Sequence, residues 1–232
     1  MKIEIWSDFA CPFCFIGKKR FDQALSRFPY KDHVEVVFNA YQLNPSAPKT
    51  MVGNAYEAFA KSHGISVDQA RAKFTMVSQN AKTVGLNFDY DRVQMTNTFD
   101  AHRLAKWAAT FGQEPRLTER FMQAYFIEGK NLADHPTLLA LVEELGLDVT
   151  AAKTVLDSHQ FANEVRQQIA DARQIGVQGV PFFVVNRQYG ISGAQSEEYF
   201  YAALEQIWQE QEGNNVFGED GDGATCTDEG CN

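Results

Sequence analysis

The chain begins with a strand-like pattern of apolar residues, continues with a helical one, and returns to a strand. Residues 2–7 (KIEIWS) alternate between polar and apolar positions, and residues 33–43 (HVEVVFNAYQL) contain a β-branched apolar run. Between them, apolar residues recur every three or four positions after Pro12, a residue that suits the first turn of a helix. The order strand, helix, strand predicts a parallel strand pair over residues 1–43 with a right-handed crossover.

The middle of the chain is predicted to be all-helical, because its periodic segments end at glycines and begin at capping residues such as Ser66. Strand patterns return at residues 180–192, where Pro181 opens a strand and a tight turn at Asn186 and Arg187 leads into a second one. An amphipathic helix is expected over residues 196–211. We therefore predict an α/β fold with one mixed sheet, divided into residues 1–44 and 175–212 (sheet domain), 45–174 (helical insertion) and 213–232 (flexible acidic tail).

Composition narrows the class of protein. The 232 residues are 44% apolar and 12% aromatic, which is enough for a substantial core. The net charge of −9 is concentrated after residue 204, where no Lys or Arg occurs, so the body is near neutral and nucleic acid is not expected as a partner. No stretch approaches the ~20 apolar residues of a membrane span, and the first residues do not resemble a signal peptide. We expect a cytoplasmic protein with no membrane partner; disulfides there are mostly catalytic.

Cys11 and Cys14 form a C-x-x-C motif in the strand–helix–strand segment, which is typical of a thioredoxin-like redox site. Cys11 is expected at the N-terminus of the helix, where unpaired N–H groups and the positive helix end stabilise a thiolate. Cys14 is expected one turn further on, positioned to resolve a mixed disulfide. Structural zinc normally needs four ligands, and no second Cys/His pair has zinc-ribbon spacing, so no metal is predicted.

Four stretches carry a resemblance to a known family: SDFACPFCFIGKKRF (7–21), NTFDAHRLAKWA (97–108), AYFIEGKNLAD (124–134) and GVQGVPFFVVNRQYGISGAQ (176–195). The chain resembles the DsbA-type branch of the thioredoxin superfamily and, within it, the FrnE-like dithiol–disulfide oxidoreductases and isomerases. The resemblance covers about residues 1–210. It implies a thioredoxin-like fold with a large all-α insertion, protein disulfide oxidoreductase or isomerase activity, and no cofactor. Its substrates would be protein or small-molecule thiols and disulfides, with glutathione as a candidate.

The resemblance also implies roles for individual residues. Cys11 would be the nucleophile, Cys14 the resolving thiol and Pro181 a cis-proline that faces them. Val180 would offer its backbone to an extended substrate, beside Pro12 and Phe13 of the C-x-x-C motif. Strongly oxidising relatives carry His where this chain has Phe13, which cannot donate a hydrogen bond to sulfur, so we expect a less oxidising couple.

Three questions stay open at this point. His102, in NTFDAHR, has two interpretations. It lies over the dithiol, where it binds substrate or shuttles a proton, or it is a packing residue of its helix. Cys226 and Cys231 form a C-x4-C pair in the predicted tail and are either a redox relay for Cys11 and Cys14 or passive. The alternative function is a glutathione-dependent isomerase or transferase of the 2-hydroxychromene-2-carboxylate isomerase or kappa-transferase type, but such enzymes do not need two thiols. The sequence does not indicate the direction of electron flow or the oligomeric state.

Overall fold

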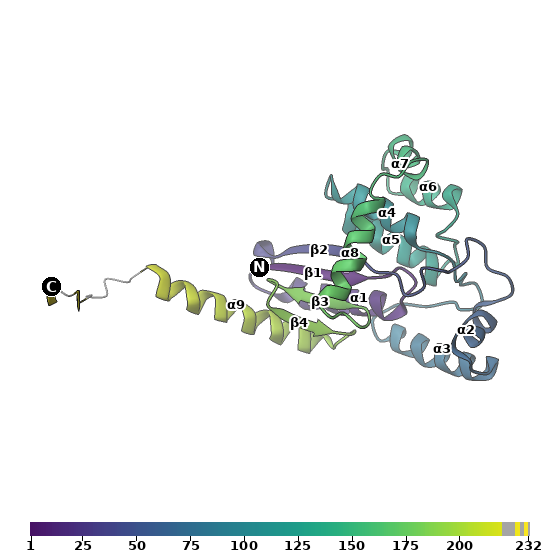
Figure 1. The fold of residues 1–232 in the computed structure, drawn as a ribbon. Helices are drawn as coiled ribbons and strands as arrows, with labels where there is room; N and C mark the ends of the chain where they lie inside the picture. Colours follow the sequence, from purple (N-terminus) through teal and green to yellow (C-terminus); the bar gives the residue numbers. More distant parts are fainter. Residues whose placement is uncertain (220–225, 228–229, 232) are drawn as a thin grey trace.

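A computed structural model describes the backbone of residues 1–219, 226–227 and 230–231, and the side chains up to residue 211. Its centre is a four-stranded sheet in the order β2–β1–β3–β4 (Figure 1). Strand β1 (Lys2–Ser7) pairs parallel to β2 (Glu35–Ala40) and antiparallel to β3 (Phe182–Val185), and β3 forms a hairpin with β4 (Tyr189–Ser192). The predicted parallel pair and the predicted hairpin are both confirmed.

One face of the sheet is covered by the first and the last long helix. Helices α1 (Pro12–Arg27) and α9 (Glu197–Glu219) pack against each other and bury Ile3 and Ile5 of β1 in a shared cluster. Aromatic rings interlock there, and Phe183 lies 4.7 Å from Phe200 in an edge-to-face arrangement. The alternation of β1 therefore places Ile3 and Ile5 in this core, while Trp6 faces the opposite side.

The opposite face of the sheet is covered by helix α8 (Ala162–Gln174), which crosses it in Figure 1. The indole nitrogen of Trp6 donates to the carbonyl oxygen of Gln168 at 2.9 Å, and the backbone N–H of Ala40 donates to the Gln168 side chain at 2.9 Å. The sequence-based division places α8 in the helical insertion. In the structure it packs both on β2 of the sheet and on α4 of the helical segment.

A short 3-10 helix, η1 (Lys31–His33), precedes β2. The helical segment begins after β2. Figure 1 shows this segment beyond the end of the sheet at which β1 ends. Its first two helices, α2 (Ala55–His63) and α3 (Val67–Lys82), are set apart from the others. The capping boxes at Asn54 and Ser66 explain where the first two helices begin, and the predicted cap at Ser66 is confirmed. The other helices of the segment are α4 (Phe99–Ala109), α5 (Glu114–Phe126), α6 (His135–Glu144) and α7 (Val149–Leu156).

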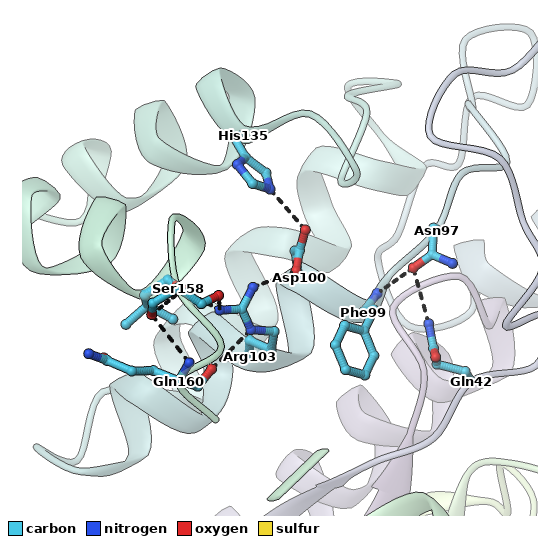
Figure 2. Close-up of polar contacts among 9 residues, drawn as sticks. Gln42, Asn97, Phe99, Asp100, Arg103, His135, Ser158 and Gln160 are labelled. Carbon is cyan, nitrogen blue, oxygen red and sulfur yellow. Dashed lines mark hydrogen bonds and ion pairs between the residues drawn. The ribbon is translucent and has the colours of Figure 1, made fainter. Parts of the chain in front are cut away.

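Asn97 ties the start of α4 to the loop after β2 (Figure 2). Its side-chain oxygen accepts from the backbone N–H of Phe99 at 2.9 Å and from the Gln42 side chain at 3.3 Å. Its side-chain nitrogen donates to the carbonyl oxygen of Pro45 at 2.9 Å. These bonds fix the loop after β2, which contributes Leu43 to the cavity beside Cys11.

Asp100 and Arg103, one turn apart on α4, join that helix to its neighbours (Figure 2). Arg103 is 4% exposed and pairs with Asp100 at 2.8 Å, while His135 contacts the other Asp100 oxygen at 2.8 Å. Burial opposes ionisation of Asp100, but hydrogen bonds from His135 and Arg103 outweigh it and lower the pKa of the carboxyl. The remaining Arg103 donors bind the carbonyl oxygens of Val155, Ser158 and Gln160.

The end of the chain differs from the prediction. Helix α9 continues to Glu219, beyond the predicted end at residue 211, and no proline interrupts residues 197–219. Two short strands follow, β5 (Cys226–Thr227) and β6 (Gly230–Cys231), whose antiparallel register places the two cysteines opposite each other. The side chains of Cys226 and Cys231 lie outside the described residues, so the predicted relay stays a prediction.

Within the residues that the structure describes, no helix combines the length and the apolar character needed to cross a membrane.

Candidate active site

Cys11 lies where the loop after β1 meets helix α1. It is the N-cap residue, with extended backbone angles (φ −94°, ψ 113°), and Pro12 follows in the first turn, as the sequence predicts. The Cys11 side chain does not cap its own helix, and its Sγ instead donates to the carbonyl oxygen of Val180 at 3.3 Å. The Cys11 thiol is therefore held between the mouth of α1 and the loop before β3.

Cys14 lies one turn behind Cys11, and in the described part of the chain neither cysteine is in a disulfide. The Cys14 N–H donates to the Cys11 carbonyl oxygen at 3.1 Å, and its side chain is 2% exposed. Burial raises the pKa of the Cys14 thiol well above its ordinary value; the adjacent Cys11 raises it further, and a hydrogen bond with Ser7 opposes the shift. Cys14 is therefore a protonated thiol at neutral pH and must lose its proton before it attacks.

Asp8 organises the loop that presents Cys11. Its carboxylate is almost fully buried and accepts from the Thr98 hydroxyl at 2.8 Å, from the Leu43 N–H at 2.8 Å and from the Ala10 N–H at 3.3 Å. Its carbonyl oxygen accepts from the Cys11 N–H at 3.0 Å. One residue thus joins β1, the loop after β2, helix α4 and the nucleophile. Sequence reasoning missed Asp8, although an acidic residue directly after an apolar strand and before the C-x-x-C was a signal.

Pro181 lies against helix α1 on the far side of Val180. The Val180–Pro181 peptide bond is cis, as the sequence predicts, and the Pro181 carbonyl oxygen accepts from the Gly193 N–H at 2.9 Å. A Cβ atom added at Gly17 would lie 3.0 Å from Pro181 Cγ, so glycine at this position lets the loop approach the helix closely. This contact positions the Val180 carbonyl oxygen beside Cys11.

A cavity of about 590 Å³ opens beside Cys11, within the size range of small-molecule sites. Cys11, Pro12, Phe13 and Val180 line it, so it brings together four of the residues predicted to act or to bind substrate. Phe13 is 41% exposed and Cys11 is 4% exposed. Most of the remaining wall is apolar and comes from the helical segment: Phe59, Phe74, Val77, Val93, Met95 and Phe126.

His102 occupies a different place from the predicted substrate-binding position. It is 4% exposed and does not line the cavity. Its ring lies 4.5 Å from the Phe9 ring, and its Nε2 lies 3.6 Å from an Asp8 oxygen. Helix α4 turns His102 inward toward the Asp8 loop, so in this structure it packs away from the cavity and does not contact the predicted substrate position.

Tyr90, in the loop between α3 and α4, lines the cavity with Cys11 and was not recognised from the sequence. The residue is 7% exposed, and its hydroxyl is buried without a hydrogen-bond partner among the described residues. Burial raises the pKa of the phenol strongly, and the charge of Cys11 raises it further. Tyr90 therefore stays protonated beside the nucleophile and is a donor of hydrogen bonds.

A mixed sheet with a dithiol at the mouth of its first helix, next to a cis-proline loop, defines a DsbA-like thiol oxidoreductase architecture. A sequence model of the DSBA-like thioredoxin domain matches residues 2–205. The chain belongs to this family.

The comparisons also identify individual relatives. The crystal structure of the probable DsbA oxidoreductase SCO1869 from Streptomyces coelicolor is 36% identical, covers 100% of this chain and 98% of its own, and has a TM-score of 0.84. The uncharacterized protein YwbO from Bacillus subtilis is 27% identical and covers 87% of this chain and 94% of its own. The cytosolic disulfide reductase DsbM from Pseudomonas aeruginosa, solved with GSH, is 20% identical, covers 90% and 100% of the chains, and shares the fold with a TM-score of 0.61.

Proposed function

We propose that this protein is a disulfide oxidoreductase and isomerase that cycles Cys11 and Cys14 between dithiol and disulfide. The observation that carries the proposal is the contrast between the two thiols. Cys11 lines a cavity at a helix N-terminus, whereas Cys14 is enclosed one turn behind it and has a raised pKa. This arrangement separates an attacking thiol from a resolving thiol.

In the reductive direction, the Cys11 thiolate attacks one sulfur of a substrate disulfide. A bond forms between Cys11 and that sulfur, and the other substrate sulfur leaves as a thiolate with the bonding electron pair. Cys14 then loses its proton and attacks the Cys11 sulfur, which closes the Cys11–Cys14 disulfide and releases the second substrate sulfur as a thiolate. The substrate gains two electrons and the dithiol loses two. The oxidative direction is the reverse, and attack on the mixed disulfide by another substrate thiolate gives isomerisation.

The substrate groups nearest Cys11 are proposed to contact Val180, Pro12 and Phe13. The Val180 carbonyl oxygen already accepts from the Cys11 thiol, so it marks where a substrate chain would run past the nucleophile. Pro181 holds this loop against α1, and Phe13 forms part of the apolar wall at the cavity. Substrates are protein or small-molecule disulfides and thiols, and a cavity of this size has room for glutathione.

The test is a Cys14→Ser variant, which leaves the mixed disulfide without its resolving thiol. Reduced Cys14→Ser is incubated with a disulfide-bonded protein, run on a non-reducing gel and mapped by mass spectrometry. We expect an adduct on Cys11 that dithiothreitol releases, and no such adduct in a Cys11→Ser control. An absence of adduct in Cys14→Ser, or an equal yield in Cys11→Ser, would contradict the mechanism.

Glutathione-dependent isomerase or transferase chemistry is the second candidate, favoured by the size of the cavity beside Cys11. That chemistry needs one group at the helix mouth, so Cys14→Ser would keep full turnover of an organic substrate with glutathione. The oxidoreductase proposal predicts that the same variant loses disulfide turnover. We further propose a cytoplasmic location and glutathione as a candidate thiol substrate, which cell fractionation and a glutathione-coupled assay would test.

A further inference from the structure

The Cys11 thiol has a hydrogen-bond acceptor as its neighbour, which suits the thiol but not the thiolate. Its Sγ donates a proton to the carbonyl oxygen of Val180 at 3.3 Å. Once Cys11 ionises it has no proton to donate, and the carbonyl oxygen then faces a negative charge. The N-terminus of α1 stabilises that charge in part, and a hydrogen-bond donor on the cavity side would stabilise it further.

The wall of the same cavity contains a donor that is not in use. The Tyr90 hydroxyl is buried, and in the part of the chain that the structure describes it has no hydrogen-bond partner. Most buried hydroxyls in proteins are hydrogen-bonded, so an unpartnered one that lines the same cavity as the nucleophile calls for an explanation. The ring itself is well fixed, because it stacks on Phe74 at 4.1 Å and meets the edge of Phe126 at 6.4 Å.

Other charged and polar groups of the cavity wall are less suited to this role. Lys73 is exposed, and Asn80 is half-buried and held through its side-chain oxygen. The other phenol of the wall, Tyr125, has its pKa raised by burial, and Cys11 is not among the charges that shift it. The Tyr90 phenol, by contrast, keeps its proton because burial and the Cys11 charge both raise its pKa. It therefore acts as a donor and not as a base at any pH where Cys11 reacts.

We propose that the Tyr90 hydroxyl donates a hydrogen bond to the ionised sulfur of Cys11 and so stabilises the reduced, nucleophilic form of the enzyme. The inference rests on the proposed Cys11–Cys14 chemistry and assigns a donor to its nucleophile. In the disulfide form Cys11 carries no charge and the hydroxyl loses this partner. The hydrogen bond therefore favours the dithiol and makes the couple more oxidising.

The test compares Tyr90→Phe with Tyr56→Phe. Both changes remove one hydroxyl from a ring packed on Phe74, but Tyr56 donates to Asp91 at 3.0 Å and does not line the Cys11 cavity. The measured quantity is the equilibrium constant between the Cys11–Cys14 couple and the glutathione pair. We expect Tyr90→Phe to shift this constant about tenfold toward the disulfide, which corresponds to about 30 mV, and to slow alkylation of Cys11 at fixed pH. Tyr56→Phe should leave both unchanged.

The free energy of unfolding of the oxidised Tyr90→Phe variant is a second readout, and it should not fall. In the disulfide form the hydroxyl has no thiolate to bind and its removal takes away an unsatisfied polar group, so oxidised Tyr90→Phe should unfold at the same or a higher urea concentration than the oxidised native protein. A more reducing couple in a protein of undiminished stability would separate the proposed role from a packing role. An unchanged equilibrium constant, an equal shift in Tyr56→Phe, or a clear loss of stability in oxidised Tyr90→Phe would overturn the proposal. A native protein with no Cys11–Cys14 couple at all would instead refute the proposed function.

Discussion

Replacing Asp8 with Ala tests whether this residue holds the active-site loop in place. The change removes a buried carboxylate that accepts short hydrogen bonds from Thr98 and Leu43, both at 2.8 Å, and a longer one from Ala10. Each hydrogen bond to a charged group contributes about 1.5–3 kcal/mol to stability. The loss of these bonds is offset in part, because the variant no longer buries a carboxylate and so avoids its desolvation penalty. We therefore expect Asp8→Ala to lower the free energy of unfolding by about 2–4 kcal/mol.

The assay is urea unfolding of the reduced protein, followed by tryptophan fluorescence, with Asp32→Ala as the control. Asp32 is an exposed acidic residue in η1, and its removal should change the free energy of unfolding by less than about 0.5 kcal/mol. The Asp8 carboxylate holds the loop that presents Cys11, so its loss should also alter Cys11 alkylation in the folded variant, although the backbone bond from the Cys11 N–H to the residue 8 carbonyl oxygen is kept. Equal stability of the two variants would refute the reasoning, because it would mean that the Asp8 hydrogen bonds do not support the loop.

Three further predictions concern the scaffold and the two thiols. Arg103→Met should destabilise the protein by about 3–5 kcal/mol in urea unfolding, because Arg103 is buried and paired, whereas the exposed Arg116→Met should have little effect. Phe13→His places a donor at the cavity beside Cys11 and should raise the reduction potential by about 30–60 mV in a glutathione titration. Mass-mapped alkylation of the reduced native protein should label Cys11 first at neutral pH, and Cys14 should react only as the pH rises above the ordinary cysteine range, because burial raises its pKa.

The parallel strand pair, the hairpin and the start of the helix after Ser66 could be predicted because they depend on local signals. Alternation fixes which residues of β1 face each layer, and capping residues such as Ser66 fix where helices begin. The placement of α8 on the sheet could not be predicted, because it depends on contacts between Gln168 and residues more than a hundred positions away. The length of α9 was also missed, because the glycines within its sequence lower helix propensity but do not prevent a helix from forming.

The residues of the candidate site also divide into those that could be predicted from the sequence and those that could not. Cys11, Cys14 and Pro181 could be identified because motif spacing and element order place them together. Asp8 and Tyr90 could not, because their roles arise from the loop after β2 and from the helical segment folding back onto the start of α1. The inward orientation of His102 could not be predicted either, because sequence neighbours do not tell which face of a helix turns toward a cavity.

The measurement that tests the central claim most directly is a redox titration of the native protein against reduced and oxidised glutathione, with thiols counted at Cys11 and Cys14 by mass mapping. The account predicts that both thiols disappear together along a single two-electron curve, and that either single Cys→Ser variant abolishes that curve. Glutathione attached to Cys11 while Cys14 stays free at every ratio would contradict the account.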